Sequence, residues 1–266
     1  TVIEVEEGLS ELTVYQQHLN DCALFDDQIL SKLLKVSTKP DDSRPGFAAL
    51  PDLRQLEAYS NFTQRRYHEQ ISYIIEQIHA GEVYQVNLSQ QFILPAQGLA
   101  PDFFWGSWRE VAKPLYGAYI PIPNSGCTLI SASPETFFIA NNSQIRCSPI
   151  KGTRPRSDNP RRDAELRAEL LRSEKDQAEL AMIVDLIRND LNRVSKIASV
   201  KVEQDARLET LPHLFHLVSD VTAELTPDKN IIDLLLALFP CGSVTGAPKV
   251  AAMKHIIECE QTARGP

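Results

Sequence analysis

The chain has 266 residues, 43% of them hydrophobic, enough to bury a sizeable core as one large domain or two smaller ones. Its 35 acidic and 27 basic residues give a formal charge of -8, which argues against a nucleic-acid or membrane-surface partner because both need a basic surface. The five scattered cysteines contain no CxxC pair. They favour neither a disulfide framework nor a zinc site, and they predict a reducing, cytoplasmic location.

The first 60 residues show no visible chemistry, and their mixed sequence predicts a helix followed by a proline-containing connection. From Thr63 onward, apolar residues recur at steps of three and four up to Ile78, and Gly81 follows. This pattern predicts a core-facing helix. Because the chain begins at Thr1 without Met and stops directly after a helical pattern, we expect it to be a fragment of a longer protein.

The middle and the last third of the chain predict a sheet with helices around it. Residues 82–94, 129–140 and 144–150 have strand character, with a hairpin turn at 141–143. Residues 161–193 predict two helices broken near 173–176, with Asp176 a candidate cap for the second. Further elements follow in order: strands at 198–202 and 213–225, a helix at 227–239, a loop at 241–247 and a helix from Pro248 to 260.

Two acids on the second of these helices are candidate metal ligands. Asp176 and Glu179 stand three residues apart, so they share one helix face, and Mg²⁺ is held by one or two carboxylates plus water and substrate oxygens. A solvated acidic face explains the same spacing.

Other candidate site residues lie in turns and loops. The segment Gly242–Ala247 combines small residues and hydroxyls ahead of a helix, which favours an anion such as a carboxylate, although a plain turn has the same pattern. It matches neither a Walker A loop nor G-x-G-x-x-G. Lys151 follows a predicted strand and is either a surface charge or, if buried, a nucleophile. Glu135 either points an acid into a cleft or occupies an exposed turn.

Several segments together carry a resemblance to one family. They are GEVYQVNLS at 81–89, SPE at 133–135, PIKGTRP at 149–155, Glu179 with DLIRND at 185–190, HLVS at 216–219 and GSVTGAPK at 242–249. In this order they resemble the chorismate-utilising enzymes, which include anthranilate synthase component I, aminodeoxychorismate synthase component I, and the isochorismate and salicylate synthases. The resemblance spans about residues 63–266.

The resemblance implies an α+β (α/β) fold in which two antiparallel sheets pack together with helices around them and an active-site cleft between them. Residues 1–60 would be the remnant of an N-terminal region, and 61–266 a chorismate-binding catalytic domain cut at its C-terminus. The family continues beyond residue 266 with pyruvyl-carboxylate-binding residues, a Gly-rich loop and further Mg²⁺ carboxylates. We therefore expect this chain by itself to be inactive.

The resemblance also assigns roles within the site. Lys151 would attack ring carbon 2 of chorismate, and Glu135 would be the acid that assists loss of the 4-hydroxyl. Ammonia would come from a glutamine amidotransferase subunit. Glu179, with Asp176 directly or through water, would bind Mg²⁺, and the pocket would be lined by Gly152, Thr153, His216, Ser243, Thr245 and Gly246.

Two positions distinguish the branches of the family. Lys151 favours aminodeoxychorismate synthases, of the p-aminobenzoate and folate pathway, because anthranilate synthases usually carry Ala there. Gln85 replaces the lysine that activates water in isochorismate and salicylate synthases, and an amide is no base near neutral pH. Cys241 stands where the family is expected to have Gly, and the resemblance assigns no chemical role to this position. Anthranilate synthase and a non-catalytic chorismate-binding or subunit-docking fragment are the alternatives.

Overall fold

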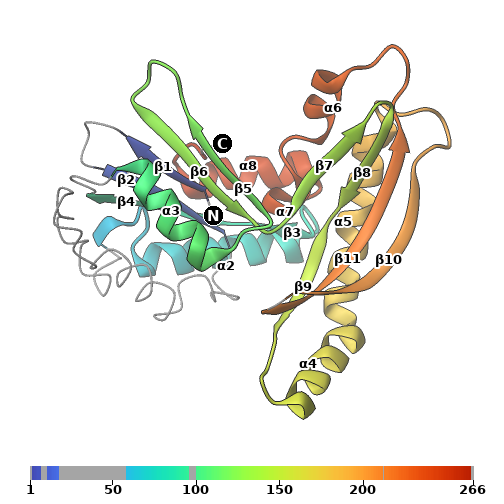
Figure 1. Ribbon diagram of the computed structural model, residues 1–266, viewed down its shortest axis with the longest axis horizontal. Helices are drawn as coiled ribbons and strands as arrows, with labels where there is room; N and C mark the ends of the chain where they lie inside the picture. Colours follow the sequence, from blue (N-terminus) through green and yellow to red (C-terminus); the bar gives the residue numbers. More distant parts are fainter. Residues whose placement is uncertain (1, 7–10, 18–57, 96–99, 212, 265–266) are drawn as a thin grey trace. The chain divides into compact units, whose positions relative to one another are not determined.

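A computed structural model describes residues 2–6, 11–17, 58–95, 100–211 and 213–264. The chain divides into two compact units. Unit 1 comprises Thr1–Glu82, Asn87–Pro134 and Lys254–Pro266, and unit 2 comprises Val83–Val86 and Glu135–Met253. Each unit holds one five-stranded antiparallel sheet with helices beside it (Figure 1), which confirms the predicted mixture of helices and antiparallel sheets. The predicted domain boundary near residue 60 stays a prediction.

The sheet of unit 1 includes two strands near the N-terminus that were not predicted. Its strand order is β4-β2-β1-β6-β5, and its strands are β1 (Val2–Glu6), β2 (Glu11–Gln17), β4 (Ser89–Pro95), β5 (Tyr116–Pro121) and β6 (Cys127–Ser133). The described residues before position 18 form β1 and β2, which pair with β6 and β4, far along the chain. Such long-range pairing overrides weak local preference. The predicted helix and the proline-containing connection otherwise fall on residues 18–57, which lie outside the described residues.

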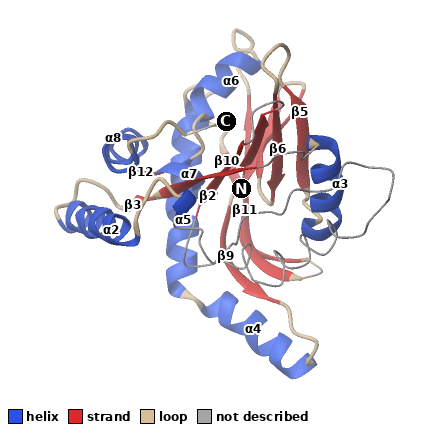
Figure 2. Cartoon of the chain, turned by 90° about the vertical axis from the view of Figure 1, so that its left-hand side faces the viewer, coloured by secondary structure: helices blue, strands red, loops and turns tan. Residues whose placement is uncertain are grey.

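Among the described residues, three helices belong wholly or partly to unit 1. The predicted helix at 63–81 is confirmed as α2 (Gln64–His79), with the Thr63 hydroxyl accepting from the Arg66 N–H as its cap. Helix α3 (Pro101–Ala112) lies beside β5 and β6 (Figure 2) and was not predicted, and neither was β5. Helix α8 (Lys249–Glu260) contacts α2, because the Tyr73 hydroxyl lies 3.1 Å from His255 Nδ1.

The sheet of unit 2 is organised by its longest strand, β11. The order is β10-β11-β8-β7, and β9 pairs with the first half of β11. The strands are β7 (Thr136–Asn141), β8 (Gln144–Ser148), β9 (Ile150–Pro155), β10 (Lys201–Thr210) and β11 (Leu214–Glu224). Strands β3 (Gln85–Val86) and β12 (Gly246–Ala247) form a separate two-stranded ladder.

The helices of unit 2 cover one face of this sheet (Figure 2). Helices α4 (Pro160–Arg172) and α5 (Glu174–Asn192) confirm the predicted pair, but the cap is Ser173, whose hydroxyl accepts from the Asp176 N–H, and not Asp176 itself. Helix α6 (Ile231–Leu238) begins four residues later than predicted because Asn230 forms a capping box with Asp233. No described helix is long and apolar enough to cross a membrane.

Alternation along β11 determines which side chains face these helices. Phe215, Leu217, Val221 and Ala223 are at most 3% exposed and lie in one core with α5 residues such as Leu180 and Ile183. Side chains of successive strand residues point to opposite faces. His216 is therefore left to the face away from the helical core.

Candidate active site

A bulge between β9 and β11 sets the position of Lys151. Thr153 pairs with His216 and Ile150 with Val218, so β9 takes three residue steps where β11 takes two. Gly152 adopts φ +82° inside this bulge, a conformation that side-chain-bearing residues rarely adopt. Bulges redirect side chains, and Lys151 is only 8% exposed. The surface-charge interpretation of this lysine is therefore wrong.

The carboxylate of Glu135 lies in the same part of unit 2 and has two hydrogen-bond donors. Its Oε1 accepts from the Ser243 hydroxyl at 2.8 Å and from the Ile150 N–H at 3.3 Å. Burial raises the pKa of Glu135, although these two bonds and the nearby charge of Lys151 act in the opposite direction. A buried carboxyl with a raised pKa keeps its proton to higher pH, as a general acid requires.

His216 presents an unused polar atom. Its Nδ1 lies 2.9 Å from the Thr153 hydroxyl, whereas its Nε2 is buried and has no hydrogen-bond partner among the described residues. Burial lowers the pKa of His216, against smaller effects of Glu209 and the Gly152 backbone, so the imidazole is neutral near pH 7. Because buried polar atoms are nearly always paired, the free Nε2 points to a ligand.

The segment 241–247 is more ordered than the predicted loop. Residues Gly242–Thr245 form a short helical turn, α7, and β12 follows. The Thr245 hydroxyl donates to the Cys241 carbonyl at 2.9 Å, so it stabilises the turn. A Cβ on Gly246, at φ +143°, would lie 2.1 Å from the Gln85 carbonyl oxygen. The amide Oε1 of Gln85 is also buried without a partner among the described residues.

The two predicted metal ligands share one face of α5, and each already faces a cation. Asp176 Oδ2 accepts from Arg154 Nη2 at 3.1 Å, and Glu179 Oε1 lies 3.7 Å from Lys175 Nζ. Lys175 is largely exposed, which leaves Glu179 the freer of the two acids. Carboxylate oxygens suit Mg²⁺, so the pair fits as part of a ligand set. The described residues contain no group of three or more His, Cys, Asp or Glu that could hold a metal ion.

The structure brings together residues that sequence reasoning treated separately. The Glu135–Ser243 contact joins positions 108 residues apart, and the Thr153–His216 contact joins positions 63 apart. The role of Arg154 was missed, although it stands in one of the quoted motifs. Pairing between motifs has no signal in a single sequence, because it is decided when the sheet and the helices assemble.

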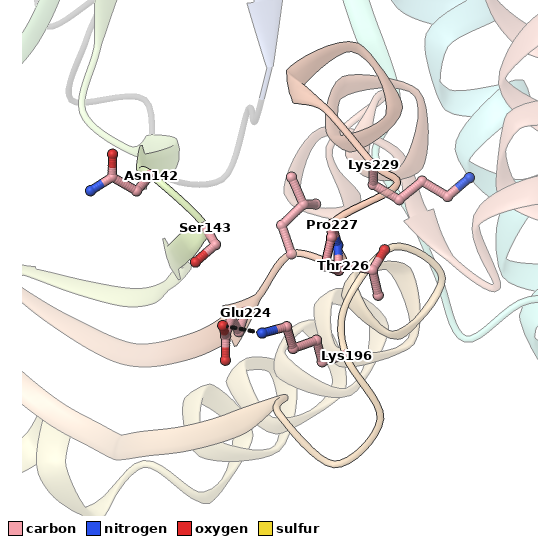
Figure 3. A pocket seen from close by; sticks show the side chains of 8 residues that line it. Asn142, Ser143, Lys196, Glu224, Thr226, Pro227 and Lys229 are labelled. Atoms are coloured by element: carbon pink, nitrogen blue, oxygen red, sulfur yellow. Dashed lines mark hydrogen bonds and ion pairs between the residues drawn. The ribbon is translucent and has the colours of Figure 1, made fainter.

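A cavity of about 340 Å³ in unit 2 lies away from these residues. It is lined by Asn142, Ser143, Lys196, Glu224, Leu225, Thr226, Pro227 and Lys229 (Figure 3). Glu224 is eight residues beyond His216 on β11, or ~26 Å along a strand. Its carboxylate neutralises Lys196 at 2.5 Å. The cavity contains none of the predicted site residues.

Comparison with known proteins assigns the family. Residues 3–266 match the family of chorismate binding enzymes, and the chain belongs to this family. It is 41% identical over 205 residues to aminodeoxychorismate synthase component 1 of Escherichia coli (strain K12), which covers 77% of this chain and 45% of the relative. It is 39% identical over 280 residues to aminodeoxychorismate synthase component 1 of Bacillus subtilis (strain 168), covering 97% of this chain and 58% of the relative.

Anthranilate synthases are similarly close. One from Haloarcula marismortui is 39% identical over 207 residues, covering 78% of this chain and 42% of the relative. Among solved structures, anthranilate synthase component I of Streptococcus pneumoniae TIGR4 matches with a TM-score of 0.69 and 31% identity, covering 77% of this chain and 45% of that one. The chain thus spans about half the length of the curated relatives that it matches.

Proposed function

We propose that the protein carrying this chain converts chorismate and ammonia into 4-amino-4-deoxychorismate. The observation that carries the proposal is the buried Lys151, held at a bulge beside the pKa-raised Glu135. A buried amine next to a carboxyl with a raised pKa suits nucleophilic attack coupled to acid catalysis. The product would enter p-aminobenzoate and folate synthesis, and a glutamine amidotransferase subunit would supply the ammonia.

The chemistry divides between these two side chains. The amine nitrogen of Lys151 forms a bond to ring carbon 2 with its lone pair, the ring double bond shifts, and the bond from carbon 4 to its hydroxyl breaks. Glu135 gives its proton to the departing oxygen, which leaves as water. Ammonia then bonds to carbon 4, the double bond shifts back, and the bond between Lys151 and carbon 2 breaks. The new ammonium group returns one proton to Glu135, which regenerates the enzyme.

Binding of chorismate would use the unpaired and small groups around this centre. The free Nε2 of His216 and the Oε1 of Gln85 are buried atoms that a ligand can satisfy. Gly152 and Gly246 allow backbone to lie where a Cβ would collide with its neighbours, and Thr153 holds the His216 ring. Ser243 fixes Glu135, while Thr245 stabilises the turn that carries Ser243.

Mg²⁺ belongs to the proposal as a cofactor. Glu179 would hold it, with Asp176 acting directly or through water, and a bound divalent cation would offset the charge of a substrate carboxylate. The Arg154–Asp176 bond favours the indirect role for Asp176.

Anthranilate synthase is the second candidate, because relatives with that name match with nearly the same identity. The two reactions differ in their product, since only the first retains the enolpyruvyl group. The buried Lys151 favours the first. A non-catalytic chorismate-binding role gives no reason for burying a lysine beside a carboxyl with a raised pKa.

The test is product analysis on the protein that carries this chain, supplied with chorismate, ammonium and Mg²⁺. Wild type should form 4-amino-4-deoxychorismate, and Lys151→Ala should abolish it without unfolding the protein. Lys201→Ala, an exposed lysine on β10, is the matched control and should behave as wild type. Undiminished amination by Lys151→Ala would refute the covalent step, and anthranilate from the wild type would replace the proposed reaction with its alternative.

A further inference from the structure

A buried ion pair in unit 2 has no part in the chemistry described above. Lys249 Nζ donates to Asp190 Oδ2 at 2.5 Å and to the carbonyl of Leu238 at 3.0 Å. The side chains of Lys249 and Asp190 are 12% and 8% exposed. This one ammonium group therefore joins α5, the end of α6 and the beginning of α8.

Stability alone gives little reason for such a pair. Two charges lose their hydration on burial, and apolar residues of similar volume often stabilise a protein equally well or better. Burial indeed raises the pKa of Asp190, against the opposing effects of Lys249 and Arg193. Charged hydrogen bonds differ from apolar contacts because they fix direction and register. The contribution of this pair therefore lies in the geometry that it fixes.

The pair anchors both ends of segment 239–248, which carries Ser243. Lys249 holds the carbonyl of Leu238, eleven residues earlier, so both ends of segment 239–248 are anchored at one point. Within the segment, Gly242 approaches α5 so closely that a Cβ would lie 2.4 Å from Leu186 Cδ2. Its next residue, Ser243, donates to Glu135 at 2.8 Å. A shift of a few tenths of an ångström at the anchors would weaken this bond.

We infer that Asp190 and Lys249 are positioning residues for Glu135: their ion pair fixes segment 239–248 so that the Ser243 hydroxyl stays on the Glu135 carboxylate. The inference rests on the proposed function only for the task of Glu135 as an acid. The chain of contacts runs from the ion pair, through the anchored segment, to Ser243 and the carboxylate.

The test compares three variants of the protein that carries this chain. Lys249→Met alone leaves the buried Asp190 without its hydrogen-bonded counter-ion, which destabilises the fold for reasons unrelated to positioning. The informative variant is the double substitution Asp190→Leu/Lys249→Met, which removes both charges and the bond to Leu238 but keeps apolar volume. Ser243→Ala is the benchmark, because it removes only the hydroxyl that contacts Glu135.

The first readout is the titration of Glu135 by NMR with ¹³C-labelled glutamate, assigned with Glu135→Gln. Ser243→Ala should raise the pKa of Glu135, because the lost hydrogen bond favours the charged form. The folded double variant should show the same rise, and adding Ser243→Ala to it should cause no further change. Chorismate consumption should fall by the same factor in Ser243→Ala, the double variant and their combination, on the order of tenfold for the loss of one hydrogen bond.

A folded double variant that titrates and consumes chorismate like the wild type would overturn the inference and leave the pair a merely structural one. Additive effects of Ser243→Ala and the double substitution would overturn it too, because the pair would then act by another route. The titration needs no turnover, and consumption is followed whatever the product. Failure of this inference is therefore distinguishable from failure of the proposed amination, which product identity decides.

Discussion

Substituting Gly152 by Ala should couple a stability loss to a loss of activity. The residue has φ +82°, and a Cβ would lie 2.8 Å from Asp176 Cβ and 2.9 Å from Leu170 Cδ1. A left-handed conformation costs a residue with a side chain ~1–2 kcal/mol, and overpacking adds ~1–3 kcal/mol. The sum of about 2–5 kcal/mol predicts a fall in Tm on the order of 10 °C. The bulge that directs Lys151 should also shift, so amination should fall.

Two other glycines separate the contributions. Gly81 has φ +79°, but a Cβ on this residue would have no atom within 4 Å, so Gly81→Ala should show the conformational cost alone, ~1–2 kcal/mol. Gly106 lies within α3, with φ in the ordinary range and open space around it, so Gly106→Ala should stabilise by ~0.5–1 kcal/mol. Thermal unfolding of the three variants provides the comparison. If Gly152→Ala lowers the free energy of unfolding no more than Gly81→Ala does, the close approach of β9 to α4 and α5 is refuted.

Three further outcomes are expected. Glu135→Gln should slow amination by ~10²–10⁴-fold. It should also remove the decline in rate that is expected of the wild type as rising pH deprotonates this carboxyl, whose pKa burial raises; a wild-type pH profile in the variant would exclude Glu135 as the acid. The folded pKa of His216 is below the ordinary 6.5, so its contribution to stability is present above about pH 6.5 and is lost as pH falls, when the unfolded chain takes up the proton. His216→Gln should therefore lose less Tm between pH 7.5 and 5.5 than wild type, and an equal loss would contradict the burial argument. Glu179→Gln should weaken the Mg²⁺ dependence of activity more than Asp176→Asn does, as metal titrations would measure; unchanged curves for both would make these acids a solvated helix face.

Local sequence determined the elements whose pattern is long and regular. Helix α2, the pair α4 and α5, and strand β11 were predictable because each repeats a helix or strand period over several turns or residue pairs. The break between α4 and α5 is the point where the helical pattern is interrupted. The motifs around Lys151 and Glu135 identified the family, which the comparisons confirm. The capping residue of α5 was wrong by three positions, since Ser173 and Asp176 are both favourable caps and only the backbone path decides between them.

Tertiary structure decided what a single sequence leaves open. Strands β1 and β2 are strands because β6 and β4 supply their hydrogen-bond partners, and no local pattern announces a partner more than 70 residues away. The burial of Lys151 depends on a bulge that appears only when β9 pairs with β11. The bonds from Ser243 to Glu135 and from Lys249 to Asp190 likewise join distant segments. Sequence thus supplied the chemical groups, while long-range pairing fixed which groups meet and which are removed from water.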